Sequence, residues 1–319
     1  MDNIKNIGLG TAAIGRPLYI NIRYEKAGVD LSLPEFREKG IRMLDSAYSK
    51  GIRFFDTSPG YGLAESLLIE WLPQKNDPDI TVATKWGLSY VANFDLNATV
   101  HEVKEHSLEK LNAQWEYSKK LLPYLEVYQI HSATLDTVVL DNKAILQRLH
   151  QIKKEYNLII GLTTTGINQV EVVKKAVDIE IENEPLFSSF QSTYNIMEQS
   201  VLQLQTTLHN GNRKLIIKES LANGRLIPNA LFKKHHGLYQ SLSKLASKYN
   251  VGADAIAIRF CIDSFPQAVC LSGASSANQL QSNLTATTFK LQKEEMELLR
   301  SYKISPAIYW DERKQLRWQ

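Results

Sequence analysis

Short apolar runs recur along the chain, and each is followed by a turn and then by a longer segment with helical periodicity. The runs contain consecutive Ile, Val, Leu and Phe residues rather than a strict alternation of apolar and polar positions, which is typical of strands covered on both faces. The pattern predicts eight strands, at residues 6–10, 52–56, 80–85, 125–131, 158–163, 186–191, 214–218 and 268–273.

The segments between these runs predict amphipathic helices, because apolar residues recur in them at intervals of three and four. Asn168 and Ser276 are typical N-cap residues. No low-complexity stretch and no linker rich in Pro, Gly or Ser divides the chain. The series of strand–helix units therefore predicts an α/β protein, a single-domain (β/α)8 TIM barrel over residues 1–319. The most regular helices are predicted at residues 36–50, 101–115, 142–156, 168–177 and 237–250.

Two segments are longer or less regular than this pattern requires. Residues 16–34 form a long loop after the first strand, and residues 301–319 form a tail rich in aromatic residues. Long connections in barrels often carry function, because the active site lies at the carboxyl ends of the strands, although they serve equally as structural cover. We expect the tail to lie near a substrate pocket.

The composition changes the fold prediction little but excludes several classes of function. The chain is 44% hydrophobic and 22% charged, with a formal net charge of +3 and no long block of Lys or Arg, which argues against nucleic-acid binding. The spacing of Cys261 and Cys270 indicates neither a metal site nor a disulfide framework, so we expect reduced thiols. Neither a signal peptide nor a run of 18 apolar residues is visible, and we expect a cytoplasmic protein that does not bind membranes.

Chemically useful side chains stand at the ends of three consecutive predicted strands. Asp56 ends the second, Lys85 the third and His131 the fourth, and Tyr61 follows on the loop after the second. Because the carboxyl ends of barrel strands face one side, we expect these four side chains to meet at the mouth. Taken alone, each has an ordinary structural explanation: the aspartate forms a turn, the lysine is solvated, the histidine belongs to the core and the tyrosine anchors a loop. Their coincidence at successive strand ends favours a catalytic site.

The four side chains suit one reaction. A phenol with a pKa near 10 is a weak acid at neutral pH, and a neighbouring ammonium lowers that pKa. We therefore expect Lys85 to make Tyr61 a better proton donor and Asp56 to neutralise the lysine. A neutral His131 would donate a hydrogen bond to a carbonyl oxygen. Together they suit the reduction of a carbonyl group, or the oxidation of an alcohol in reverse.

Several segments resemble the aldo-keto reductase family. GIRFFDTSPGYGLAESLLIEWL (51–72) resembles the family's signature around its catalytic aspartate and tyrosine. TVATKWG (81–87) is similar to the segment that carries the family's lysine, and LEVYQIHSA (125–133) to the one that carries its histidine. The resemblance extends over residues 6–290 through three later segments, IIGLTTTGINQVEVV, FSSFQSTYNIME and LSGASSANQLQSNL.

This resemblance implies a (β/α)8 barrel that binds a nicotinamide dinucleotide across its mouth. It assigns Tyr61 as the general acid/base, with Asp56 and Lys85 tuning that phenol and His131 placing the substrate carbonyl. By the same resemblance, Gln191 holds the nicotinamide amide and the last strand–helix loop holds the adenosine end. The cofactor-binding positions that it implies are Thr163, Thr164, Gln191, Lys218, Leu221, Arg225, Gly273, Ser275, Gln279 and Asn283.

Three positions, in two segments, depart from the family pattern. Thr163 and Thr164 replace the usual Ser-Asn pair beneath the nicotinamide, and Thr164 cannot supply an asparagine amide. Lys218 stands where the family often places an aromatic residue that stacks on the nicotinamide, and it is either a phosphate ligand or a solvated lysine. Lys218 and Arg225 are the nearest basic candidates for a 2′-phosphate, and we expect NADP(H) in preference to NAD(H).

The expected partner is a small carbonyl or sugar substrate, and the oligomeric state is not predicted. Aromatic side chains near the mouth would suit a sugar or an aromatic aldehyde. Nearby arginines would hold a carboxylate or phosphate, or serve only solubility. The residues concerned are Tyr19, Tyr24, Trp86, Tyr309, Trp310, Arg16, Arg23 and Arg313.

Two other functions stay open from the sequence. One is a regulatory or sensor barrel that binds a nicotinamide dinucleotide with little turnover. The other is a lyase or isomerase that uses Lys85 as a Schiff-base amine, which leaves Gln191 and the last strand–helix loop without a role. The intact set of four strand-end residues favours the oxidoreductase, because a binding module needs no proton donor.

Overall fold

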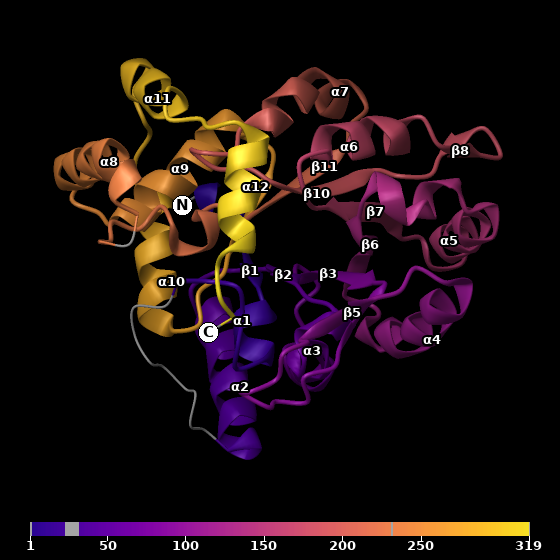
Figure 1. The fold of residues 1–319 in the computed structure, drawn as a ribbon. Helices are drawn as coiled ribbons and strands as arrows, with labels where there is room; N and C mark the ends of the chain where they lie inside the picture. Colours follow the sequence, from indigo (N-terminus) through magenta and orange to yellow (C-terminus); the bar gives the residue numbers. More distant parts are fainter. Residues whose placement is uncertain (1, 23–31, 231, 319) are drawn as a thin grey trace.

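Eight parallel strands close into a barrel in the computed structural model, which describes residues 2–22, 32–230 and 232–318 (Figure 1). Around the barrel the order is β1-β12-β11-β10-β7-β6-β3-β2, and every neighbouring pair is parallel. Each strand coincides with or overlaps a segment where the apolar runs predict one, so the predicted fold is confirmed. The strands are β1 (Ile7–Gly10), β2 (Phe54–Asp56), β3 (Thr81–Trp86), β6 (Leu125–Ala133), β7 (Ile159–Thr164), β10 (Ser189–Thr193), β11 (Lys214–Lys218) and β12 (Val269–Ser272).

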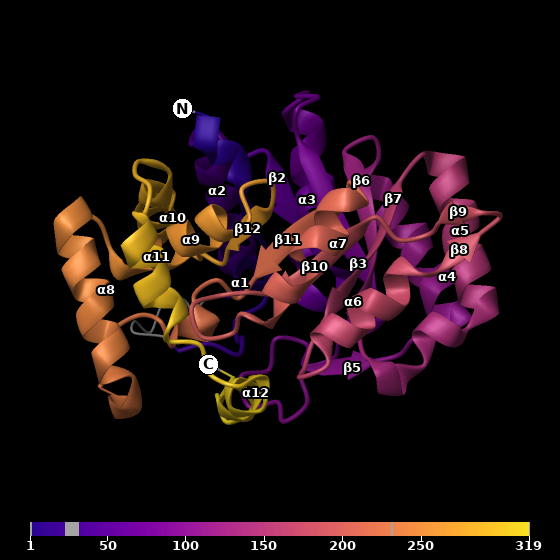
Figure 2. The ribbon, with the colours of Figure 1, turned by 90° about the horizontal axis from the view of Figure 1, so that it is seen from above.

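Helices form a ring around these strands, and α12 lies across one end of the barrel (Figure 1). Figure 2 shows α12 at that end, while the N-terminus lies at the opposite end. The helices are α1 (Ala12–Gly15), α2 (Leu33–Ser49), α3 (Ala64–Trp71), α4 (Leu108–Ser118), α5 (Lys143–Tyr156), α6 (Gln169–Val177), α7 (Gln205–Asn210), α8 (His236–Tyr249), α9 (Ala253–Ser264), α10 (Ala277–Leu284), α11 (Lys293–Arg300) and α12 (Pro306–Lys314).

Two short hairpins lie outside the barrel and correct one helix prediction. Residues 102–104, expected as the start of a helix, form strand β5, which pairs antiparallel with β4 (Leu88–Tyr90). The helix α4 begins only after Ser107, whose side chain accepts a hydrogen bond from the backbone of Lys110. The second hairpin joins β8 (Glu180–Ile181) to β9 (Glu184–Pro185).

The two predicted N-caps differ in their chemistry. The Ser276 hydroxyl accepts a hydrogen bond from the Gln279 backbone and so caps α10 as predicted. Asn168 occupies the position before α6, but its side chain makes no capping hydrogen bond. A polar residue before a segment of helical periodicity therefore predicts where both helices begin. Whether its side chain makes the capping hydrogen bond depends on the local side-chain conformation.

The inside of the barrel is apolar below the mouth and polar at the mouth. Because side chains two positions apart on a strand face the same side, Asp56 lies on the same face as Phe54, and Lys85 on the same face as Ala83. The strand ends therefore place charged groups directly above an apolar floor. That floor comprises Phe54, Ala83, Val127, Ile159, Ile216, Val269 and Leu271.

Other sequence expectations concern single features. Cys261 and Cys270 are both buried, and neither forms a disulfide among the described residues. Across the described ranges, no helix has both the length and the apolar character needed to cross a bilayer.

Candidate active site

Asp56 and Lys85 form a buried ion pair inside the barrel. The Lys85 Nζ donates to Asp56 Oδ2 at 2.7 Å and to the backbone oxygen of Thr57 at 2.8 Å. Burial lowers the pKa of Lys85, while the Asp56 carboxylate acts to raise it. The second carboxylate oxygen of Asp56 accepts a hydrogen bond from Gln191 Nε2 at 2.7 Å. One carboxylate thus fixes both a lysine and a glutamine at the centre of the mouth.

Tyr61 is brought beside this pair by a short 3-10 turn, Pro59–Tyr61, that follows β2. The Lys85 Nζ lies 4.8 Å from the centroid of the Tyr61 ring, over its face. Burial raises the pKa of Tyr61 well above 10, the Asp56 carboxylate raises it further, and the Arg16 guanidinium lowers it. The expected lowering of this pKa by Lys85 is therefore not found, because burial of the phenol dominates and Asp56 offsets the lysine charge.

His131 lies between Tyr61 and the turn that carries it. Its Nε2 is 3.5 Å from Tyr61 Oη, and its Nδ1 is 3.1 Å from the Ser58 hydroxyl. Burial, followed by the charges of Lys85 and Arg16, lowers the pKa of His131 well below its usual value, so the imidazole is neutral. The structure therefore brings all four strand-end residues together.

Ser58 contacts the imidazole of His131 on the side away from Tyr61. The buried Ser58 hydroxyl accepts a hydrogen bond from the Gly60 backbone and lies 3.1 Å from His131 Nδ1, and we infer that it donates its proton to that nitrogen. The neutral imidazole then carries its proton on Nε2, the atom nearest Tyr61 Oη. Sequence analysis missed this residue, although its place in the TSPG turn between Asp56 and Tyr61 marks it as part of the same loop.

Arg16 and residues from both irregular segments cover the mouth. The Arg16 guanidinium is 4.9 Å from the ring centroids of Tyr19 and Trp318, and it donates to Glu102 Oε1 at 2.5 Å. Trp318 also stacks on His101, with ring centroids 4.3 Å apart. The end of the chain therefore packs over the loop after β1.

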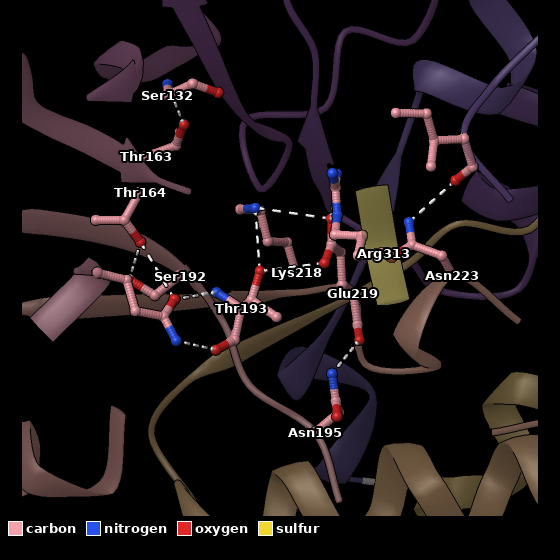
Figure 3. Close-up of polar contacts among 12 residues, drawn as sticks. Ser132, Thr163, Thr164, Ser192, Thr193, Asn195, Lys218, Glu219, Asn223 and Arg313 are labelled. Atoms are coloured by element: carbon pink, nitrogen blue, oxygen red, sulfur yellow. Dashed lines mark hydrogen bonds and ion pairs between the residues drawn. The ribbon is translucent and has the colours of Figure 1, made fainter. Parts of the chain in front are cut away.

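Lys218 enters the same region from the end of β11 (Figure 3). Its Nζ donates to Thr193 Oγ1 at 3.1 Å and lies 3.9 Å from Glu219 Oε1. Burial lowers the pKa of Lys218 to about 8. Burial acts to raise the pKa of Glu219, but Arg313 and Lys218 outweigh it and lower that pKa to about 2. Lys218 is therefore part of a half-buried charge cluster and not a fully solvated strand-end lysine.

Thr163 and Thr164 point to different surroundings (Figure 3). The Thr163 hydroxyl oxygen accepts from the backbone of Ser132 at 2.7 Å. The Thr164 hydroxyl donates to Ser192 at 2.9 Å and lies 3.4 Å from Gln169 in α6. Because neighbouring residues of a strand face opposite sides, Thr164 turns its hydroxyl towards the helix layer, away from the expected nicotinamide position.

Arg225 binds residues of α12 in this structure. Its side chain is fully buried, and Nη1 donates to Glu312 Oε2 and to the Tyr309 backbone, each at 3.1 Å. The guanidinium therefore holds α12 against the loop after β11, and its assignment to a 2′-phosphate stays a prediction. Leu221 lies half-buried in the same loop and packs against the core.

The loop that we expect to bind adenosine follows β12, and some of its polar groups hydrogen-bond to one another. The Gln279 Oε1 accepts from both the backbone and the hydroxyl of Ser275, at 3.0 and 3.2 Å. The Asn283 amide is held by Ser272 and by Asp254, each at 2.7 Å. Gly273 is exposed, and a Cβ there would meet nothing within 4 Å, so the loop surface is open at that point.

A basic residue that sequence analysis missed lies beside this loop. Lys39 of α2 lines a small pocket together with Ser275. It reads in the sequence as an ordinary polar-face residue of a predicted helix, and only the closure of the barrel brings α2 next to the last strand–helix loop. The pocket is completed by Ala13, Ile14, Pro17, Phe36 and Gly40.

The aromatic residues and arginines expected around a substrate have different environments. Trp86 and Tyr309 are fully buried, and Trp310 is nearly so. Arg313 is engaged by Glu219, with its Nη2 at 2.7 Å from Oε1. Arg23 and Tyr24 lie outside the described residues.

Comparison with known proteins shows the family and the fold. The model of the Aldo/keto reductase family matches residues 6–304. L-Galactose dehydrogenase of Arabidopsis thaliana is 27% identical over 266 residues, 80% of each chain. Norsolorinic acid reductase of Emericella nidulans is 23% identical over 301 residues, 86% of this chain and 73% of that protein. A solved glycerol dehydrogenase of Gluconobacter oxydans shares the fold, with a TM-score of 0.68 and 22% identity over 93% of this chain and 90% of the other.

Proposed function

Because the chain belongs to the aldo/keto reductase family, and is therefore a nicotinamide-dependent oxidoreductase of carbonyl or alcohol groups, we propose that Tyr61 is its general acid/base. The observation that carries this proposal is the placement of Tyr61 Oη 3.5 Å from His131 Nε2, above the buried pair of Asp56 and Lys85. The favoured reaction is reduction of an aldehyde or ketone. The reverse reaction would oxidise a sugar or another alcohol at the same groups.

The polar groups at the mouth fit a nicotinamide carboxamide. Gln191 is held through its Nε2 by Asp56, which leaves its carbonyl oxygen as an acceptor. The Thr163 hydroxyl accepts from the Ser132 backbone, so its proton is available to donate. One buried atom of the residue beside Gln191, the Nε2 of Gln129, has no partner within the described part of the chain. Buried polar atoms without a partner favour a polar ligand. When bound, a reduced nicotinamide supplies the hydride that the carbonyl carbon receives.

Tyr61 and His131 act on the substrate oxygen in this proposal. The Tyr61 Oη donates its proton to the carbonyl oxygen as negative charge develops there. The His131 Nε2–H donates a hydrogen bond to the same oxygen and orients it. The raised pKa of Tyr61 keeps the phenol protonated at neutral pH, as the reductive direction requires.

Lys85 and Asp56 act after the proton has left Tyr61. The phenolate then lies beside the Lys85 ammonium, which stabilises it electrostatically. Asp56 holds that ammonium in place and keeps the pair neutral while Tyr61 is protonated. Proton transfer from solvent restores the phenol for the next turnover.

NADP(H) is the proposed cofactor in preference to NAD(H), with its adenosine end at the loop after β12. A 2′-phosphate there would contact Lys39 and Ser275, which line the same pocket. Gly273, Gln279 and Asn283 would border the adenosine.

The proposed substrate is a small carbonyl compound or a sugar. The names of L-galactose dehydrogenase and glycerol dehydrogenase, both similar to this chain, favour a hydroxyl-rich molecule. Residues 1–319 would act as one domain, and the tail 301–319 would border the substrate pocket. Support for this placement comes from Trp318, which packs on Arg16 over the mouth.

A binding titration followed by an activity screen tests the proposal. The protein is titrated with NADPH and with NADH while tryptophan fluorescence is followed, and aldehydes and sugars are then assayed in both directions. The proposal predicts tighter binding of NADPH and turnover of at least one aldehyde. Binding of both dinucleotides without any turnover would instead favour a sensor barrel.

A further inference from the structure

Lys218 faces the interior of the barrel one layer above Gln191. On β11, Ile216 belongs to the apolar floor and pairs in register with Gln191. Lys218 is two residues further along, so it faces the same side, and it pairs with Thr193 at the end of β10. The Lys218 ammonium is therefore directed over the groups that would bind the nicotinamide and the substrate.

The cluster of charged side chains at the mouth holds one more cation than anions, and Lys218 is the cation without a carboxylate of its own. Three ion pairs in the region have one cation and one anion each: Lys85–Asp56 at 2.7 Å, Arg16–Glu102 at 2.5 Å and Arg313–Glu219 at 2.7 Å. Lys218 shares Glu219 with Arg313 and lies further from it, at 3.9 Å. Within the described residues of this cluster, the formal charges therefore sum to one positive charge.

The Lys218 ammonium has donor capacity left for another acceptor. An ammonium has three protons, and one of them is donated to Thr193 Oγ1 at 3.1 Å. The Glu219 carboxylate already accepts from Arg313 Nε at 2.7 Å and is 3.3 Å from the hydroxyls of Tyr309 and Thr193. The Trp310 ring, whose centroid is 5.8 Å from Lys218 Nζ, adds an apolar wall.

We propose that Lys218 binds an anionic group of the substrate, a carboxylate or a phosphate, and so makes the enzyme selective for anionic carbonyl compounds. The inference rests on the proposed function. A charge-assisted hydrogen bond is stronger than a neutral one, and a neutral substrate would leave the excess positive charge of this half-buried cluster unpaired. Lys218 is thus a specificity residue, while Tyr61 and His131 act on the carbonyl.

The selectivity should depend on pH. The titratable or charged groups that face Lys218 are Glu219, Arg313, Lys85, Asp56 and His131. Burial lowers the pKa of Lys218 to about 8, and of these groups Glu219 opposes the shift most. The ammonium is therefore charged below that pH, and the preference for an anionic substrate falls as the pH rises through about 8.

The test compares 4-carboxybenzaldehyde with its methyl ester at pH 7. We expect kcat/KM of the wild type to favour the carboxylate by about tenfold or more. In Lys218→Met the ratio should fall to within about threefold of unity. Lys214→Met, on the exposed end of the same strand, is the control and should keep the wild-type ratio. Equal use of both compounds by the wild type, or an unchanged ratio in Lys218→Met, would overturn the proposal.

Two further measurements identify the source of the anion and separate this proposal from the proposed function. The ratio of the Kd values of NADPH and NADH should be the same in Lys218→Met as in the wild type. Loss of that discrimination with retention of the carboxylate preference would assign Lys218 to the cofactor phosphate instead. If no aldehyde is reduced, the proposed function fails, and calorimetry with benzoate and benzamide still tests Lys218. Benzoate should bind the wild type more tightly than benzamide and lose that advantage in Lys218→Met, and equal binding would overturn the proposal.

Discussion

The ammonium of Lys85 lies 2.7 Å from the carboxylate of Asp56, and neither side chain is more than 3% exposed. The apolar strand β2 ends on an acid at this point because the neighbouring strand β3 carries, next to its last residue, a lysine that has no access to water. The pair holds opposite charges in the centre of the mouth, and Tyr61 and Gln191 are both positioned against it.

Replacing one member of this ion pair should destabilise the fold more than expected from replacing both together. Asp56→Asn leaves a buried ammonium without its counter-charge, and we expect a loss of about 3–5 kcal/mol in the free energy of unfolding. The double variant Asp56→Asn with Lys85→Met should be less destabilised than the sum of the two single variants, because no lone charge remains. Urea denaturation of all four proteins measures this coupling, and strictly additive losses would contradict the pairing.

Ser58→Ala tests the proton position on His131. Without the hydroxyl, Nδ1 loses the donor that keeps the proton on Nε2, and we expect kcat/KM to fall about tenfold, the equivalent of one hydrogen bond. The dissociation constant of NADPH should stay within about twofold of the wild-type value, because Ser58 lies under the imidazole and not at the dinucleotide. An unchanged kcat/KM would show that the tautomer is fixed by another group.

Lys39→Met tests the proposed 2′-phosphate contact. Loss of one charge-assisted hydrogen bond should raise the Kd of NADPH about tenfold and leave the Kd of NADH unchanged. Arg42→Met is the matched control, because Arg42 lies on the same helix but is exposed and paired with Glu38. Equal weakening of both dinucleotides would place the 2′-phosphate elsewhere.

Glu65 predicts a pH dependence of stability that is separate from catalysis. Burial raises its pKa from 4.5 to about 7, against the hydrogen bonds from Thr84 and Ser118. The folded state then binds a proton more tightly than the unfolded state, so stability falls as the pH rises from about 4.5 to 7 and is level above that.

Glu65→Gln removes this titration and keeps an amide oxygen for both hydroxyls. We expect its free energy of unfolding, relative to the wild type, to increase by about 3 kcal/mol between pH 4.5 and pH 8. Urea denaturation at both pH values measures the difference, and Glu109→Gln on the surface of α4 is the control. A difference that does not change with pH would contradict a neutral Glu65 in the folded state.

The sequence was sufficient to predict the barrel and the meeting of the four strand-end residues. Both follow from periodicity, because apolar runs mark the strands and parallel strands bring their ends to one side. Residues 102–104 were mistaken for helix because three residues carry too little periodicity to show a hairpin strand. Whether such a short segment pairs as a strand depends on the tertiary structure around it, and a few residues of sequence carry no information on that.

The sequence could not predict contacts made by side chains from distant segments. Arg225 reads as a free basic residue beside Lys218, but α12 supplies Glu312 and buries it. Thr164 reads as a partner of Thr163, but the strand turns the two hydroxyls to opposite faces. Lys39 and Ser275 meet only because α2 and the loop after β12 become neighbours when the barrel closes.

The central claim is that Tyr61 gives the proton to the substrate oxygen, and Tyr61→Phe tests it most directly. A single-turnover reduction is followed with the variant and the wild type, each saturated with NADPH and mixed with an aldehyde that the wild type reduces. The account predicts that the variant binds NADPH with a Kd within about twofold of the wild type but reduces the aldehyde at least about a thousandfold more slowly. A Tyr61→Phe protein that reduces the aldehyde at near the wild-type rate would contradict the account and move the proton donor to another group.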